Sequence, residues 1–155
     1  MGSPVQPDLP DHPNPQRNLD QWLEYITATH PDEIEMGLQR VRSVAERMAL
    51  LKPAPRSVIV AGTNGKGTTC VCLEQILLAA GLRVGCTLSP HVHAFNERVR
   101  IDGRELDDAT LCSAFAAVES ARERTPLTYF EFVTLVALYA FRRAEVDVAI
   151  LEVGL

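Results

Sequence analysis

Apolar and polar positions alternate along the chain in a way that predicts helices linked to short strands. Apolar runs at 58–61 and 146–155 are typical of strands that are covered on both faces, and residues 83–88 are predicted to form another strand. Strands that are linked by helices normally pair in parallel, with right-handed crossovers. The expected fold class is therefore α/β, with a mostly parallel sheet flanked by helices.

Two helices are predicted before the first strand. Asn18 is a candidate N-cap with Gln21 three residues later, and this helix should end near 30–31, with Trp22 as a core anchor. A second helix is predicted over 33–51, before the prolines at 53 and 55. Its inner face should carry Leu38, Val41, Ala45 and Met48.

Three further helices and one hairpin are predicted in the rest of the chain. The helix over 66–80 should end at Gly81, and another should run from Asp107 or Asp108 to about residue 124. Residues 127–131 then lead into a strongly apolar helix through 132–141. Residues 97–106 alternate around Asp102-Gly103, which suits a type I′ turn of a hairpin.

The stretch between the first strand and its helix predicts a phosphate-binding loop. Gly62, Gly65 and Gly67 permit close backbone approach, while Lys66 adds a cation and Thr68 a hydroxyl at a helix start. The spacing departs from the usual G-x-x-x-x-G-K-[ST] pattern, because two residues separate the first glycines and one glycine follows the lysine. The alternative is a plain glycine-rich turn, which leaves the lysine unexplained.

Two further candidates lie at the carboxyl ends of the other strands, where open α/β sheets bind ligands. Ser89 offers a hydroxyl to Mg²⁺, and Glu152 is an acid in an apolar strand, which is costly unless it is paired or metal-bound. His91 and His93 are close enough to share a metal, or they are polar loop residues. Arg98 lies nearest this loop and is a candidate for contacting an anion.

For the remaining candidates, the residues alone favour ordinary structural roles. Arg98, Arg100 and Arg104 also suit the solvent face of the hairpin, and an acid such as Glu131 is expected at a helix start. Tyr129 and Phe130 fit a core, and His30 fits an ordinary loop position beside Pro31.

Composition excludes several classes of protein. The chain has 155 residues, of which 46% are apolar and 23% charged, and a net charge of −5, which argues against binding nucleic acid. No apolar run is long enough to span a bilayer and no signal peptide is visible, so a cytoplasmic location is expected. The four cysteines are expected to be reduced. Residues 1–16, with five prolines, are expected to form a disordered tail.

Five blocks of sequence resemble one known family. They are 60–70, 89–91, 96–100, 127–132 and 150–155. The phosphate loop, the serine loop and the terminal acidic strand together resemble the Mur ligase superfamily of ATP-dependent amide-forming enzymes. Within that superfamily, the five blocks in this order are most similar to the bacterial bifunctional dihydrofolate synthase/folylpolyglutamate synthases. The resemblance extends from about Trp22 to the last residue.

The resemblance implies a role for each block. ATP phosphates would be held by Gly62, Thr63, Asn64, Gly65, Lys66, Gly67 and Thr68, with Lys66 and Glu152 as catalytic residues. Mg²⁺ would be held by Ser89 and Glu152. Dihydropteroate would be bound by Ala28, Thr29, His30, Pro31, Thr128, Tyr129, Phe130 and Glu131. The substrates implied are ATP, L-glutamate, dihydropteroate and folates, and the full-length protein would be a monomer.

The family pattern continues beyond the last residue here, so we expect residues 17–155 to be the N-terminal part of an ATP-binding, Mur-ligase-like domain that is truncated. The rest of that domain and a C-terminal domain would be absent, and the fragment alone would be inactive. Two other readings stay open. One is a Mur-type ligase for cell-wall precursors, and the other is a non-catalytic nucleotide-binding domain.

Overall fold

The structure, a computed structural model, describes residues 17–29 and 37–154. The predicted tail over 1–16 and the residues His30 and Pro31 lie outside this range. The elements in chain order are α1 (Leu19–Ala28), α2 (Gln39–Arg47), β1 (Arg56–Val60), α3 (Lys66–Ala79), β2 (Val84–Thr87), the 3-10 helix η1 (Phe95–Arg98), β3 (Val99–Ile101), β4 (Arg104–Glu105), α4 (Asp108–Arg122), α5 (Tyr129–Arg143) and β5 (Val148–Glu152).

The strands form one sheet in the order β1-β5-β2-β3-β4. β5 pairs in parallel with both β1 and β2, whereas β3 pairs antiparallel with β2 and with β4. The predicted α/β class with a mostly parallel sheet is confirmed. The expectation that the helix-linked strands β1 and β2 pair with each other is wrong, because the last strand lies between them. All three parallel strands therefore end at one edge of the sheet.

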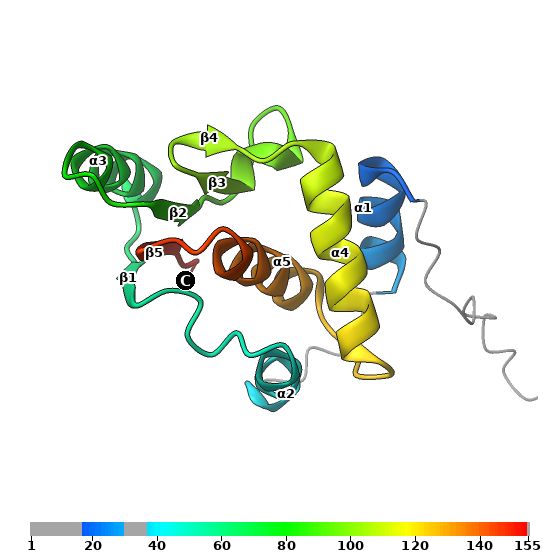
Figure 1. The fold of residues 1–155 in the computed structure, drawn as a ribbon. Helices are drawn as coiled ribbons and strands as arrows, with labels where there is room; N and C mark the ends of the chain where they lie inside the picture. The colour runs from blue at the N-terminus through cyan, green and yellow to red at the C-terminus, as the bar shows by residue number, and fades with distance from the viewer. Residues whose placement is uncertain (1–16, 30–36, 155) are drawn as a thin grey trace, which may run out of the picture.

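The two faces of the sheet are covered unequally. α5 packs on one face, with α4 and then α1 behind it, while α3 packs on the other (Figure 1). Successive residues of β5 point alternately to these faces. Ala149 belongs to the large core under α5, and Val148 and Ile150 belong to the smaller core under α3. Trp22 is 1% exposed and stacks on Phe115 with ring centroids 5.7 Å apart, so it is the predicted core anchor.

The predicted helix and turn signals act as expected. Asn18 forms a capping box with Gln21, and Asp107 caps α4 through the N–H of Thr110. Gly81 follows α3 with a φ of 79°. The turn of the hairpin at Asp102-Gly103 has φ values of 51° and 77°, as a type I′ turn requires. Local side-chain chemistry thus determines where these elements begin and end.

Two predictions about buried segments are wrong. β1 is an edge strand of the described sheet, and Ile59 is 67% exposed, so this strand is not covered on both faces. α2 is shorter than the predicted 33–51 helix, because it starts at Gln39 and the chain leaves the helix around Ala49, which has a φ of 56°. Leu38, predicted on the inner face, is 76% exposed.

Candidate functional site

The phosphate-loop candidate connects the end of β1 to the start of α3. Gly65 is the N-cap of α3 in the left-handed region, with a φ of 76°, where a side chain would be strained. The Nζ of Lys66 donates a hydrogen bond to the carbonyl oxygen of Gly62 at 2.8 Å. The side chain of Lys66 therefore lies across the loop and contacts its first glycine. The free N–H groups at the start of α3 and this cation are suited to an anion.

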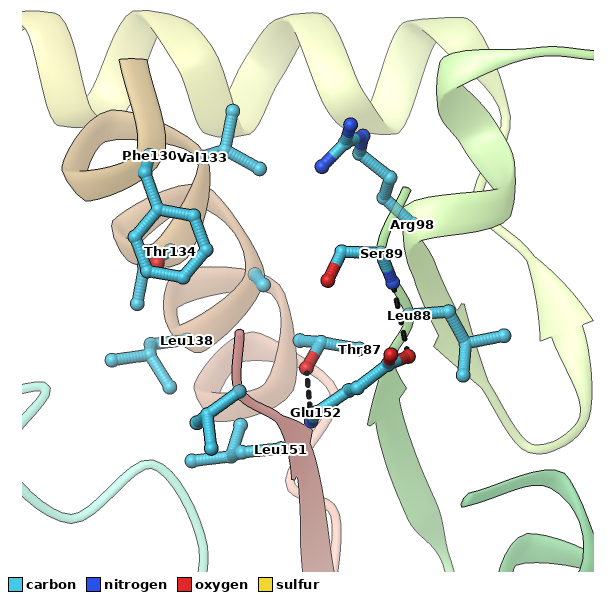
Figure 2. Close-up of a pocket in the computed structure, with 12 residues that line it drawn as sticks. Thr87, Leu88, Ser89, Arg98, Phe130, Val133, Thr134, Leu138, Leu151 and Glu152 are labelled. Carbon is cyan, nitrogen blue, oxygen red and sulfur yellow. Dashed lines mark hydrogen bonds between the residues drawn. The ribbon is translucent and has the colours of Figure 1, made fainter. Parts of the chain in front are cut away.

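Glu152 lies beside this loop at the end of β5. Its side chain is buried, with the residue 7% exposed, and its Oε2 accepts a hydrogen bond from the backbone N–H of Ser89 at 3.1 Å (Figure 2). The N–H of Glu152 donates to the hydroxyl of Thr87, also at 3.1 Å. A Cβ added to Gly67 would stand 3.8 Å from Oε2 of Glu152. The helix start, Ser89 and Glu152 thus share one edge of the sheet.

The oxygen atoms of Ser89 and Glu152 fit a magnesium ion. Within the described residues, the hydrogen bond from Ser89 is the only one to the Glu152 carboxylate, and the Ser89 hydroxyl makes none. Mg²⁺ prefers hard oxygen ligands and is usually held by one or two carboxylates together with substrate phosphates. The described part of the chain contains no cluster of three or more His, Cys, Asp or Glu that suits a metal ion. Phosphate oxygens and water would therefore have to complete the coordination of Mg²⁺ here.

The loop after β2 is organised by Glu97, which the sequence reading did not single out. Its carboxylate accepts hydrogen bonds from the backbone N–H groups of Val92, His93 and Ala94 at 2.8, 2.7 and 2.8 Å. These bonds, that from Val92 first, lower the pKa of Glu97 to about 2. The position of Glu97 in the sequence could have indicated this role, because an acid in the first turn of a short helix commonly accepts hydrogen bonds from the N–H groups before it.

One of the two loop histidines is engaged by a neighbouring arginine. Nδ1 of His91 accepts a hydrogen bond from Nε of Arg98 at 2.8 Å, so that nitrogen is occupied. His93 is exposed to solvent, and no His-containing metal cluster occurs where the chain is described. The reading of these histidines as loop residues fits this geometry better than a shared metal.

A pocket separates this loop from α5. Figure 2 shows Phe130, Thr134 and Leu138 projecting from α5 on one side, while Arg98 and Ser89 come from the other. The complete lining is Thr87, Leu88, Ser89, Arg98, Phe130, Val133, Thr134, Ala137, Leu138, Leu151, Glu152 and Val153. The pocket is mostly apolar, and it shares Glu152 with the edge of the sheet where the phosphate loop lies.

Of the candidate substrate residues that the structure describes, only Phe130 is in the lining of this pocket. Thr128 and Glu131 bond to each other in the capping box of α5, where the Thr128 hydroxyl accepts from the Glu131 N–H and the carboxylate accepts from the Thr128 N–H. Tyr129 is half-buried, and burial raises its pKa. Ala28 and Thr29 lie at the end of α1 and are not among the residues that line the pocket.

A buried ion pair near the site was also missed by the sequence reading. Glu74 on α3 is 0% exposed, and its carboxylate binds the guanidinium of Arg100 on β3 at 3.1 Å. Arg100 was expected on the solvent face of the hairpin, as Arg104 is, but it is half-buried. Glu74 follows the buried Cys70 by four residues, so its position on the inner face of the helix was the available signal.

The thiols near this ion pair form no disulfide. All four cysteines are free, as expected from the sequence, with Cys70 and Cys86 fully buried. Burial raises the pKa of both thiols. Buried thiols of raised pKa are unreactive, so they act here as small apolar side chains. Cys72, by contrast, is exposed.

The strand, glycine-rich loop and helix, together with an acid at the end of the neighbouring parallel strand, define the class of α/β domains with a phosphate-binding loop. No protein-family model matches the chain. It is 53% identical over 137 residues to the dihydrofolate synthase/folylpolyglutamate synthase of Escherichia coli, covering 88% of this chain and 32% of the relative. The protein of the same description from Haemophilus influenzae is 51% identical, with 88% and 31% covered.

Solved structures give the same result. The bifunctional folylpolyglutamate synthase/dihydrofolate synthase of Yersinia pestis superposes with a TM-score of 0.89 at 56% identity, covering 93% of this chain and 36% of that one. The Escherichia coli protein in complex with DHPP and ADP gives 0.89 at 51% identity, with 93% and 35% covered. The chain is therefore a homologue of the dihydrofolate synthase/folylpolyglutamate synthases, and it spans about a third of their length.

None of the described helices is both long enough and apolar enough to cross a bilayer.

Proposed function

We propose that the whole protein to which this chain belongs is an ATP-dependent amide ligase. It adds L-glutamate to dihydropteroate, giving dihydrofolate, and to tetrahydrofolate polyglutamates. The observation that carries this proposal is the identity of more than half of the residues over 88% of the chain to a dihydrofolate synthase/folylpolyglutamate synthase. The shared edge of the sheet, with Lys66, Ser89 and Glu152, supports it independently.

The reaction has two chemical steps. An oxygen of the substrate carboxylate attacks the γ-phosphorus of ATP, and the bond to ADP breaks to leave an acyl phosphate. The amine of L-glutamate then attacks the acyl carbon, losing a proton as inorganic phosphate departs and the amide forms. Because charge accumulates on the phosphate oxygens, positioned cations and N–H donors are the main catalytic requirement.

Each candidate residue has a role in these steps. Lys66 and the N–H groups of 62–68 bind and neutralise the ATP phosphates. Ser89 and Glu152 would hold Mg²⁺, which would supply positive charge beside the phosphates. Phe130, with the neighbouring residues of 128–131 and residues 28–31, binds dihydropteroate. The chain's own task is mainly to hold the two substrates in reactive contact.

Several properties of the whole protein belong to this proposal. The substrates are small molecules, namely ATP, L-glutamate, dihydropteroate and folates, with no nucleic acid or membrane partner. The location is cytoplasmic and the whole protein is a monomer. The 155-residue chain by itself is inactive, since it spans only about a third of the relatives that it matches.

One assay tests this proposal against its alternatives. The whole protein is supplied with ATP, Mg²⁺ and L-glutamate, and phosphate release is measured with either dihydropteroate or a UDP-sugar peptide as the acceptor. Release that depends on both glutamate and dihydropteroate is expected, with dihydrofolate as the product. Release with only the UDP-sugar peptide would indicate a cell-wall ligase. Nucleotide binding without release on any acceptor would indicate a non-catalytic domain.

A further inference from the structure

Arg98 is the single cation among the described residues that line the pocket between α5 and the loop after β2. Most of that lining is apolar, including Phe130, Val133 and Leu138. The acid in the same pocket, Glu152, makes no ion pair with Arg98 in the described structure, and its carboxylate accepts a hydrogen bond from the N–H of Ser89. A cation that faces an apolar pocket without an acidic partner calls for an anionic group on the ligand.

The side chain of Arg98 is held in place from two directions. Its Nε donates to Nδ1 of His91 at 2.8 Å. The guanidinium carbon lies 5.9 Å from the ring centroids of both Phe95 and Tyr129, within the range of cation–π attraction. These contacts orient the guanidinium plane before any ligand arrives.

The two terminal nitrogens of Arg98 make no hydrogen bond to any described residue. Figure 2 shows this end of the side chain on the side of the pocket across from Phe130. A fixed guanidinium with free terminal donors matches the geometry of a carboxylate. The pocket therefore combines an apolar wall with one preoriented carboxylate-binding group.

The size of the pocket limits what it holds. Its cavity volume is about 110 Å³. An apolar cavity of about 150 Å³ accommodates benzene, so this one, which is also open to the surface, suits one ring rather than a large bicyclic group. An aromatic acid is a ligand with the matching combination of ring and carboxylate.

We propose that Arg98 binds the carboxylate of the acceptor substrate, the group that accepts the phosphoryl group, while the wall formed by α5 holds the aromatic ring that bears it. This inference rests on the proposed function and assigns a residue to one part of its substrate. The role of Arg98 is to hold the carboxylate at the edge of the sheet where Lys66 and Glu152 lie.

The test is a binding cycle on the whole protein, without ATP. Dissociation constants are measured for dihydropteroate and for the same compound with hydrogen in place of its carboxylate. Charge-assisted hydrogen bonds predict that the wild type binds the acid about ten- to a hundredfold more tightly. Arg98→Met should lose this preference, while its affinity for the carboxylate-free compound stays within about twofold.

Two further variants complete the cycle. Arg98→Lys keeps the cation and should keep a preference of several-fold for the acid. Arg104→Met removes an exposed arginine of the hairpin β3–β4 that follows η1, and it should match the wild type with both ligands.

The outcomes separate the two proposals. The assignment is overturned if Arg98→Met keeps the preference for the acid, or if Arg98→Met and Arg98→Lys weaken both ligands equally, as a loop-ordering role would do. Wild-type protein that binds neither compound overturns this assignment and the proposed function together. Wild-type protein that prefers the acid through Arg98 but forms no amide contradicts the proposed function and leaves the assignment standing.

Discussion

Lys66 is the residue on which the proposed phosphate chemistry depends most. Lys66 is the first residue of α3, and its Nζ lies 2.8 Å from the carbonyl oxygen of Gly62. Removing one preorganised group that stabilises developing charge typically costs about 10²–10³ in rate. Lys66→Ala in the whole protein should therefore lower kcat by at least about a hundredfold in a phosphate-release assay. Lys52→Ala, which removes the other lysine of this chain, should leave kcat unchanged, and activity of Lys66→Ala near that of wild type would contradict the mechanism.

Substitution of Glu152 should change the dependence of activity on Mg²⁺, and not only the overall rate. Its buried carboxylate and the hydroxyl of Ser89 are the proposed Mg²⁺ ligands. Losing even a residue that supports a metal ligand costs about 10- to 100-fold in metal affinity or activity. Glu152→Gln should therefore raise the Mg²⁺ concentration needed for half-maximal activity at least about tenfold. The exposed Glu105→Gln serves as the control, and an unchanged Mg²⁺ titration would remove Glu152 from the metal site.

Glu97 should give the loop after β2 an acid-sensitive contribution to stability. Its pKa in the folded chain is about 2, below the ordinary 4.5. Because the folded pKa is the lower one, the stabilisation is fully present above about pH 4.5 and is lost as the pH falls towards 2. Glu97→Gln should therefore lower the urea midpoint at pH 7, with a difference from wild type that shrinks through this window. A carboxyl NMR titration of Glu97 near 4.5 would contradict the assignment.

At the scale of elements, the Glu74–Arg100 pair ties the phosphate-loop helix α3 to the hairpin β3–β4. The carboxylate is fully buried, and the guanidinium also donates to the carbonyl oxygen of Gly103 at 2.8 Å. Removing one partner of a buried ion pair costs about 3–5 kcal/mol, whereas replacing both by apolar residues is often nearly neutral. Arg100→Met should therefore destabilise the chain strongly, and adding Glu74→Leu should restore most of the loss.

Urea unfolding of the 155-residue chain, followed by the fluorescence of its one tryptophan, Trp22, measures this cycle. Arg104→Met is the matched control, because this arginine of the same hairpin is exposed and makes no ion pair with any described residue. A double variant as unstable as Arg100→Met alone would show that the buried charge is not the cause.

The sequence predicts local features well and long-range features poorly. Caps and turns such as Asn18, Gly81 and Asp102-Gly103 follow from a few neighbouring side chains, and the structure confirms them. The placement of β5 between β1 and β2 depends on pairing across about ninety residues to β1 and about sixty to β2, which no local pattern encodes.

The same division applies to the candidate site. That Ser89 and Glu152 meet was predictable, because carboxyl ends of parallel strands share an edge. The partners of Arg98 and Arg100 were not, since each lies on a different element and an alternating hairpin does not show which side is covered. The exposure of Ile59 could not be predicted either, because a β-branched run is equally typical of central and edge strands.

At the scale of the whole molecule, one side of this chain is unusually apolar for a free surface. Leu38 and Leu51, 76% and 55% exposed, border a groove that also contacts Leu135 and Leu138 of α5. Ile59, 67% exposed, lies on β1, whose outer edge has no partner strand among the described residues. Clustered exposed apolar side chains and an open strand edge usually mark a surface that another segment covers.

We expect the rest of the whole protein to cover this surface, because the relatives that match this chain are about three times its length. Hydroxyl-radical labelling, read by mass spectrometry, should modify Leu51 and Ile59 several-fold less in the whole protein than in the 155-residue chain. Trp22, which is 1% exposed, should stay protected in both and so report that the chain is folded. Equal labelling of Leu51 and Ile59 in the two forms would mean that the apolar surface stays open and has a different partner.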